Sequence, residues 1–177
     1  MKKILTLLFL ILLVGCSTKK NVTEYTEIQW MDIEDIEAAL EKEPKKVLID
    51  VYTDWCGWCK KMDATTFSDP EVIKYLNKNY YCVKFDGEEK DTVQYRGENF
   101  KFVGQGRRGY NELAFNLMKG KMSYPTYVFL DENLDILQPI KGYMTSVQFL
   151  PILTFLGEDI YKDKTWNEFV ESSKSEE

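Results

Sequence analysis

The sequence contains no histidine among its 177 residues. Histidine is the side chain that most often serves as a general base near neutral pH, and it is the most common metal ligand in proteins. Its absence excludes Cys–His and Ser–His catalytic pairs and removes a usual ligand of zinc. Acid–base chemistry in this protein must therefore use carboxylates, lysines or thiols.

A long apolar run and an excess of basic residues are also missing. The longest mainly apolar stretch, residues 4–14, is shorter than the roughly 20 residues that cross a bilayer. The net charge of −6 argues against a nucleic-acid partner. Because 44% of the residues are hydrophobic and 14% are aromatic, the chain can bury one substantial core, and we expect one globular domain.

The N-terminal residues are typical of an exported protein. Residues 1–15 combine two lysines with an apolar run, as secretory signal peptides do. The run ends in Leu-Val-Gly before Cys16, which resembles the bacterial lipobox, so Cys16 is expected to carry lipid and to provide the only membrane anchor. An uncleaved anchor and an ordinary signal cut nearby are the alternatives. Residues 16–27 are polar and are expected to form a flexible tether.

The position after Cys16 bears on location. In Gram-negative lipoproteins an aspartate there is the usual signal for retention at the inner membrane, and this chain has Ser17. The resemblance therefore implies a protein of the bacterial cell envelope that faces the periplasm and is anchored in the outer membrane.

Residues 28–162 are predicted to form an α/β domain. Short apolar runs predict strands at 28–31, 46–52 and 80–85, and helical periods follow Asp32, the turn at 56–59 and the Asp69-Pro70 cap. The helix that starts at 56–59 is expected to stop near residue 68. This order predicts a parallel sheet with right-handed crossovers. Residues 126–131 and 135–140 are expected to add an antiparallel pair, and a last helix starts at Thr145, kinked or delayed by Pro151.

Two further segments lie outside this alternation. Residues 87–122 are predicted to hold a hairpin, with strands at 93–95 and 100–103, then glycine-marked loops and a helix closed by Gly120. Residues 163–177 are expected to form one helical turn followed by a polar tail that does not pack.

Two thiols three positions apart, Cys56 and Cys59, lie where a buried strand passes into a helix. This spacing allows a small disulfide ring, and the unpaired N–H groups of a first helical turn favour a thiolate. The same spacing forms half of many zinc sites, but histidine is absent and Cys82 is the only thiol left, so no metal is expected. Redox chemistry is favoured, and a purely structural disulfide stays open.

The segment Trp-Cys56-Gly-Trp-Cys59-Lys resembles the active-site turn of the thioredoxin superfamily. The resemblance covers residues 47–143, and the segment 66–72 is most similar to the C-terminal thioredoxin-like domain of transmembrane thiol:disulfide interchange proteins and to secreted single-domain relatives. It implies a thioredoxin-like fold with a central mixed sheet flanked by helices. An N-terminal strand and helix precede that fold, and residues 87–122 form an insertion before the strand that follows Pro125.

The resemblance also implies roles for individual residues. Cys56 is expected to be exposed and to attack a substrate disulfide, and Cys59 then resolves the mixed disulfide. Asp50 lies where the family keeps a buried aspartate, and Lys84 where it keeps a lysine nearby, so Asp50 is expected to take the proton of Cys59 through a water. The alternative is that Asp50 and Lys84 form a structural pair only.

Four residues are expected to contact substrate. Tyr124-Pro125 resembles the segment whose proline is cis, where the backbone pairs with an extended substrate, and Trp55 and Trp58 are expected to form an apolar rim. Trp58 stands where thioredoxins have proline. Cys82 is predicted to be a quiet buried thiol rather than a third redox centre.

Together these features predict a lipid-anchored thiol–disulfide oxidoreductase that acts on extracytoplasmic protein disulfides and needs no cofactor. Reduction or isomerisation is favoured over oxidation, and a separate partner must reload the pair because the chain carries no membrane-spanning electron carrier. The alternative is a thioredoxin-fold module that binds peptides and uses its disulfide only as a staple.

Overall fold

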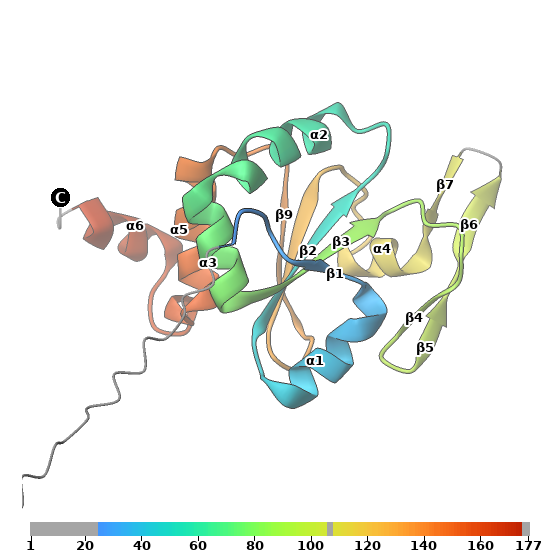
Figure 1. The fold of residues 1–177 in the computed structure, drawn as a ribbon, viewed down its shortest axis with the longest axis horizontal. Helices are drawn as coiled ribbons and strands as arrows, with labels where there is room; N and C mark the ends of the chain where they lie inside the picture. The colour runs from blue at the N-terminus through green and yellow to red at the C-terminus, as the bar shows by residue number, and fades with distance from the viewer. Residues whose placement is uncertain (1–24, 106–107, 175–177) are drawn as a thin grey trace, which may run out of the picture.

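The computed structural model describes residues 25–105 and 108–174 (Figure 1). The predicted signal peptide, Cys16 and most of the predicted tether lie outside the described residues. Within the described ranges, none of the helices has the length and hydropathy needed to span a membrane.

A five-stranded mixed sheet forms the centre of the domain, with the strand order β1-β3-β2-β8-β9. Strands β1, β3 and β2 are parallel, and β8 and β9 are antiparallel to their neighbours, which confirms the predicted mixed sheet. The strands span Trp30–Met31 (β1), Lys46–Tyr52 (β2), Tyr80–Asp86 (β3), Thr126–Leu130 (β8) and Ile136–Lys141 (β9).

Helices cover both faces of this sheet (Figure 1). Because side chains alternate along a strand, Val47, Ile49 and Val51 of β2 face one layer and Leu48 and Asp50 face the other. The first layer packs on α1 and α4, and the second on α2, α3 and α5. These helices span Ile36–Lys42 (α1), Gly57–Ala64 (α2), Pro70–Asn79 (α3), Glu112–Leu117 (α4) and Ser146–Gly157 (α5). Asp50 therefore points toward the helix that begins beside the cysteine pair.

Of two helix boundaries predicted near this layer, the start of α3 is confirmed and the end of α2 is wrong. The Asp69 cap is confirmed, since its carboxylate accepts hydrogen bonds from the N–H groups of Glu71 (2.9 Å) and Val72 (3.4 Å) at the start of α3. The helix predicted to run on to residue 68 instead ends at Ala64. The Thr65 hydroxyl donates to the Lys61 carbonyl (2.8 Å), a side-chain bond that disturbs helical backbone pairing, and a short 3-10 turn follows.

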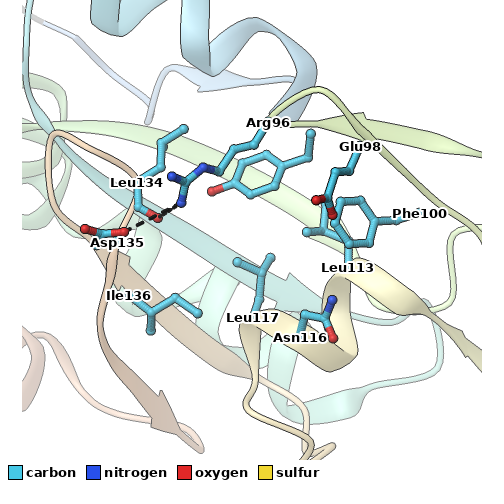
Figure 2. A pocket seen from close by; sticks show the side chains of 10 residues that line it. Arg96, Glu98, Phe100, Leu113, Asn116, Leu117, Leu134, Asp135 and Ile136 are labelled. Atoms are coloured by element: carbon cyan, nitrogen blue, oxygen red, sulfur yellow. Dashed lines mark hydrogen bonds and ion pairs between the residues drawn. The ribbon is translucent and has the colours of Figure 1, made fainter.

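The predicted insertion contains two hairpins rather than one (Figure 1). The first joins β4 (Val93–Tyr95) to β5 (Glu98–Phe100) through a two-residue turn, in which Arg96 and Gly97 both adopt positive φ (52° and 74°). The predicted second strand at 100–103 was therefore misplaced. Figure 2 shows the Arg96 guanidinium held by the Leu134 carbonyl (3.4 Å) and by Asp135 (3.6 Å).

The second hairpin pairs β6 (Phe102–Gln105) with β7 (Arg108–Asn111). Gly104 lies opposite Gly109 in this pair, where the glycines had predicted loops only. The closing position of α4 is confirmed, because Gly120 has a φ of 73° and its N–H bonds to the Phe115 carbonyl (2.8 Å).

Of the two C-terminal helices, one begins where predicted and the other is longer than predicted. Helix α5 begins directly after Thr145, as predicted, and runs through Pro151, so the proline does not delay it. Because Pro151 has no backbone N–H, the carbonyl of Val147, one helical turn earlier, receives no helical hydrogen bond from it. Val147 is 79% exposed, so water can reach this part of the helix. Helix α6 (Trp166–Lys174) has nine residues instead of one turn, because Trp166 and Phe169 pack on the Phe155 ring of α5 at 5.3 and 5.4 Å.

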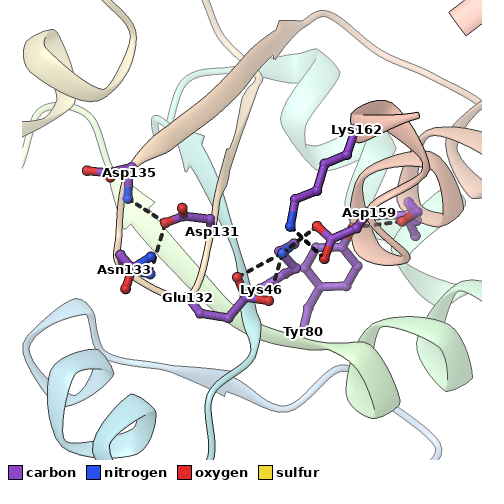
Figure 3. Close-up of polar contacts among 9 residues, drawn as sticks. Lys46, Tyr80, Asp131, Glu132, Asn133, Asp135, Asp159 and Lys162 are labelled. Carbon is purple, nitrogen blue, oxygen red and sulfur yellow. Dashed lines mark hydrogen bonds and ion pairs between the residues drawn. The ribbon is translucent and has the colours of Figure 1, made fainter. Parts of the chain in front are cut away.

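At the end of the sheet opposite the cysteine pair, a buried lysine forms ion pairs with carboxylates of two other segments (Figure 3). The Lys46 side chain is only 3% exposed, and its Nζ lies 2.7 Å from Glu132 Oε1 and 2.8 Å from Asp159 Oδ1. Burial lowers the pKa of Lys46, but the hydrogen bonds to Asp159 and Glu132 outweigh it and raise that pKa. The ammonium thus joins the start of β2 to the β8–β9 turn and to the residues that follow α5.

We expect the two carboxylates around Lys46 to act as a unit. Glu132→Gln and Asp159→Asn should each cost about 1 kcal/mol of unfolding free energy, because one carboxylate remains. The double variant leaves a buried ammonium without an anion and should cost about 3 kcal/mol or more. Lys46→Met should stay within about 1 kcal/mol of the parent protein. Urea unfolding measures all four variants.

Lys162→Met serves as the control, since Lys162 also contacts Asp159 (3.0 Å) but is exposed. Its removal leaves both partners of Lys46 in place. A double variant whose loss equals the sum of the single losses would contradict the coupling.

Candidate active site

The cysteine pair lies at the start of α2, a few residues after the end of β2. Cys56 and Cys59 form a disulfide, with their Cα atoms 5.3 Å apart. Cys56 is the N-cap of α2, and its Sγ accepts a hydrogen bond from the Cys59 N–H (3.1 Å). An N–H donor and the positive end of the helix dipole both stabilise negative charge on this sulfur.

Burial of the pair corrects one expectation. Cys56 was expected to be exposed, yet Cys56 and Cys59 are each only 3% exposed. The Cys56 sulfur is turned toward the helix N–H group rather than toward solvent. The exposed groups are the flanking rings, since Trp55 is 66% exposed and Trp58 is 57% exposed.

Asp50 and Lys84 meet as the resemblance implied. They are register partners on β2 and β3, and Lys84 Nζ lies 3.5 Å from Asp50 Oδ2. Asp50 is 1% exposed, and its second oxygen, Oδ1, has no hydrogen-bond partner among the described residues. Burial raises the pKa of Asp50 to about 7, the Lys84 ammonium opposes this rise, and the Asp63 carboxylate adds to it.

Asp63 was missed by the sequence reasoning. Its Oδ1 pairs with Lys84 Nζ, so one ammonium bridges a buried and a half-exposed carboxylate. The ammonium also lies over the rings of Trp30 (5.2 Å) and Tyr52 (5.3 Å). The available signal was spacing, because Asp63 follows Cys59 by four residues and therefore shares its helix face.

A small aromatic groove opens beside the start of α2. It has a volume of about 310 Å³ and is lined by Trp58, Tyr124, Pro125, Gly142 and Tyr143. The Tyr124–Pro125 peptide bond is cis, as the resemblance implied. Three of the four predicted substrate contacts therefore line one groove, and the fourth, Trp55, packs edge-on against Tyr124 at 5.8 Å.

The sequence did not mark two residues of the groove, Gly142 and Tyr143, and Tyr143 supplies a second aromatic wall. Its ring lies 5.6 Å from that of Trp58, and Lys61 Nζ lies within about 5 Å of both rings (5.1 Å and 4.8 Å). The Tyr143 hydroxyl is 3.2 Å from the Thr65 hydroxyl, which fixes this wall of the groove to the end of α2.

Cys82 lies apart from the pair, in the interior of β3. It is 1% exposed, and burial raises the pKa of its thiol. A thiol that keeps its proton is a poor nucleophile, which agrees with the quiet buried role predicted for it. Across residues 25–105 and 108–174, no cluster of three or more cysteine, aspartate or glutamate side chains is placed to hold a metal ion.

Known proteins resemble this chain in sequence and in fold. The profile of the family described as "Thioredoxin-like domain" matches residues 33–157. The thiol:disulfide interchange protein DsbD of Haemophilus ducreyi is 30% identical over 114 residues, which is 63% of this chain and 17% of that protein. DsbD of Pectobacterium atrosepticum is 45% identical over 47 residues, 27% of this chain and 8% of that protein. The chain thus spans less than a fifth of the curated relatives it matches.

Among solved structures, one described as "DsbH Oxidoreductase" superposes with a TM-score of 0.56 at 14% identity, over 80% of this chain and 92% of the other. At 14% identity the superposition shows only that the two folds are similar. The family profile covers more than two thirds of the sequence, including the Cys56–Cys59 turn, Asp50 and Pro125. On that match, the chain belongs to the thioredoxin-like domain family.

Proposed function

We propose that this protein is a thiol–disulfide oxidoreductase that exchanges disulfides with extracytoplasmic proteins through Cys56 and Cys59. The observation that carries the proposal is the pair at the N-terminus of α2, on the sheet face where Asp50 lies buried. A disulfide that serves only as a staple needs no carboxylate whose pKa is near 7.

The first step belongs to Cys56. In the reduced enzyme its thiolate attacks one sulfur of a substrate disulfide, so a Cys56–substrate bond forms, the substrate S–S bond breaks and one substrate thiolate leaves. The N-cap position supports this role, because the Cys59 N–H and the first turn of α2 stabilise the negative charge before attack.

The second step belongs to Cys59 and Asp50. The Cys59 thiol gives its proton to the Asp50 carboxylate, and the resulting thiolate attacks the Cys56 sulfur of the mixed disulfide. The second substrate thiolate leaves, the enzyme becomes the disulfide, and two electrons have passed to the substrate. Asp50 suits this transfer because a base with a pKa near the working pH can both accept and return a proton.

The electrostatics favour reduction or isomerisation over oxidation. Asp50 and Asp63 bring two carboxylates to a site with one ammonium, that of Lys84. Net negative charge disfavours a thiolate and so favours the disulfide, and a pair that prefers its disulfide form is a stronger reductant. The hydrogen bond from the Cys59 N–H and the positive end of the α2 dipole act in the opposite direction, but both come from neutral groups with partial charges.

Substrate is proposed to bind across the aromatic groove. Trp58, Tyr124 and Pro125 line it, and Trp55 extends the apolar surface. An extended segment of an unfolded or partly folded protein offers apolar side chains to such a surface. The lipid anchor at Cys16, the periplasm-facing outer-membrane location and a separate redox partner complete the proposal.

One observation favours the alternative of a peptide-binding module with a structural disulfide. Both sulfurs are nearly inaccessible in the disulfide form, with each cysteine only 3% exposed. A substrate thiol could reach Cys56 only if the flanking residues move. The two functions differ in redox behaviour: glutathione buffers reduce an exchanging pair, whereas structural disulfides lie below about −300 mV.

The exchange mechanism predicts a trapped intermediate. In Cys59→Ser the mixed disulfide on Cys56 cannot be resolved, so incubating the reduced variant with a disulfide-containing protein should yield a covalent adduct that dithiothreitol releases. Cys56→Ser should give none. Cys82→Ala should reduce insulin disulfides as the parent protein does. Gel electrophoresis without reductant and mass spectrometry detect the adducts, and their absence in Cys59→Ser would reject the proposed function.

The raised pKa of Asp50 predicts a loss of stability with rising pH. The folded state holds this proton up to about pH 7, whereas the unfolded chain loses it near the ordinary value of 3.8. Folded protein therefore binds more protons between these limits, and stability falls across that window and levels off above it. At about 1.4 kcal/mol per pKa unit, the total loss is roughly 4 kcal/mol.

Asp50→Asn should remove this loss and become more stable than the parent protein at pH 8. Urea unfolding of the disulfide form at several pH values between 4.5 and 8.5 measures the difference. Asp54→Asn, which changes an exposed carboxylate in the same turn, should follow the parent curve. A pH-independent difference between Asp50→Asn and the parent protein would contradict the assignment.

A further inference from the structure

Three side chains form a row across the centre of the sheet. Lys84 on β3 pairs with Asp50 on β2, and Asp50 pairs with Tyr127 on β8. Residues paired across neighbouring strands project from the same face. The Tyr127 side chain therefore lies beside Asp50 in the layer that α2, α3 and α5 cover.

The Tyr127 ring is held firmly in that layer. It is 0% exposed and packs against Phe149 (5.1 Å between ring centroids) and Phe67 (5.8 Å). A ring packed on two sides has little freedom to turn, so the direction of its hydroxyl is fixed by the core.

Two buried oxygens in this row have no hydrogen-bond partner among the described residues: the Tyr127 hydroxyl and Asp50 Oδ1. Buried polar atoms almost always have a hydrogen-bond partner, because burial removes their bonds to water without replacing them. Tyr80 in the same cluster obeys this rule, since its hydroxyl donates to the Leu153 carbonyl at 2.7 Å. A phenylalanine would fill the Tyr127 site equally well, so packing does not explain the hydroxyl.

The two oxygens are chemically complementary. The charged and titratable groups that face Tyr127 are Asp50, Asp63 of α2 and Tyr143 after β9, and all of them carry or can acquire negative charge. Together with burial they raise the pKa of Tyr127, so the phenol keeps its proton. Ionised Asp50 accepts hydrogen bonds and meets Lys84 only at Oδ2.

We propose that Tyr127 is a positioning residue of the proton-transfer site, whose hydroxyl donates a hydrogen bond, through one buried water, to Oδ1 of ionised Asp50. This inference rests on the proposed function, because it concerns the carboxylate that receives the Cys59 proton. The bond stabilises the ionised form of Asp50 against burial and so sets the pH at which Asp50 can accept that proton. Tyr127 itself neither gains nor loses a proton.

Tyr127→Phe tests the inference while keeping the ring. The carboxyl signal of Asp50 is followed by 13C NMR against pH in the disulfide form of the full chain. Without the donor, the Asp50 midpoint should move upward by about one to two pH units, because the ionised carboxylate loses a hydrogen bond that stabilises its charge. The pH profile of mixed-disulfide resolution should move in the same direction.

Tyr95→Phe is the matched control. Tyr95 is also buried, at 7% exposure, and its hydroxyl also has no partner among the described residues, but it lies in the other core cluster. Its loss should leave the Asp50 midpoint unchanged. An unmoved or lowered midpoint in Tyr127→Phe, or an equal shift in Tyr95→Phe, overturns the inference.

A measurement on the parent protein keeps the inference testable if Tyr127→Phe does not fold. With 13C-labelled tyrosine, the ζ-carbon signal of Tyr127 should titrate at the Asp50 midpoint, and this response should vanish in Asp50→Asn. A signal that ignores the Asp50 titration overturns the inference. If Cys59→Ser still forms adducts, that failure concerns Tyr127 alone, whereas absent adducts reject the proposed function whatever the titration shows.

Discussion

The burial of one carboxylate constrains the whole centre of this protein. Asp50 stands in the middle strand of the sheet at 1% exposure, where an isolated charge is strongly disfavoured. The surrounding structure compensates in part: Lys84 approaches one carboxylate oxygen at 3.5 Å and is itself shared with Asp63 on α2. Because the compensation is partial, the pKa of Asp50 rises to about 7 instead of returning to its ordinary value. The site thereby gains a carboxyl group that titrates near neutral pH in a chain without histidine.

Much of this arrangement follows from the sequence. The apolar run of β2 predicted a buried strand, and the resemblance located Asp50, Lys84 and Pro125 around the cysteine pair. These parts are predictable because each depends on local pattern or on a position within a motif. Asp63 was not predictable in the same way, because a carboxylate on a short helix looks like any solvated residue until the lysine of another strand is placed beside it.

Other differences arise where tertiary contacts override local preference. The predicted hairpin left residues 96–99 between its strands, but arginine rarely adopts positive φ, so no local rule narrows the turn to Arg96 and Gly97. The Leu134 carbonyl and Asp135, which hold the Arg96 side chain, lie between β8 and β9, outside the insertion. Helix α6 gains its extra length from the Phe155 ring of α5. The burial of Cys56 depends on which way one sulfur turns, and residue spacing carries no information on that.

The two interior charges of the β2 strand respond differently to acidity. Lys46 has a raised pKa, and Asp159 beside it has a lowered one because Lys46 and Lys162 outweigh its burial, so this ionic bridge keeps its charges through the neutral range. Asp50, four residues further along the same strand, changes charge near pH 7. A change of pH near 7 therefore changes the charge of Asp50 at one end of the strand, while Lys46 and Asp159 at the other end keep theirs. Near neutrality, pH therefore acts on this strand through the charge of Asp50 and leaves the Lys46–Asp159 ion pair unaltered.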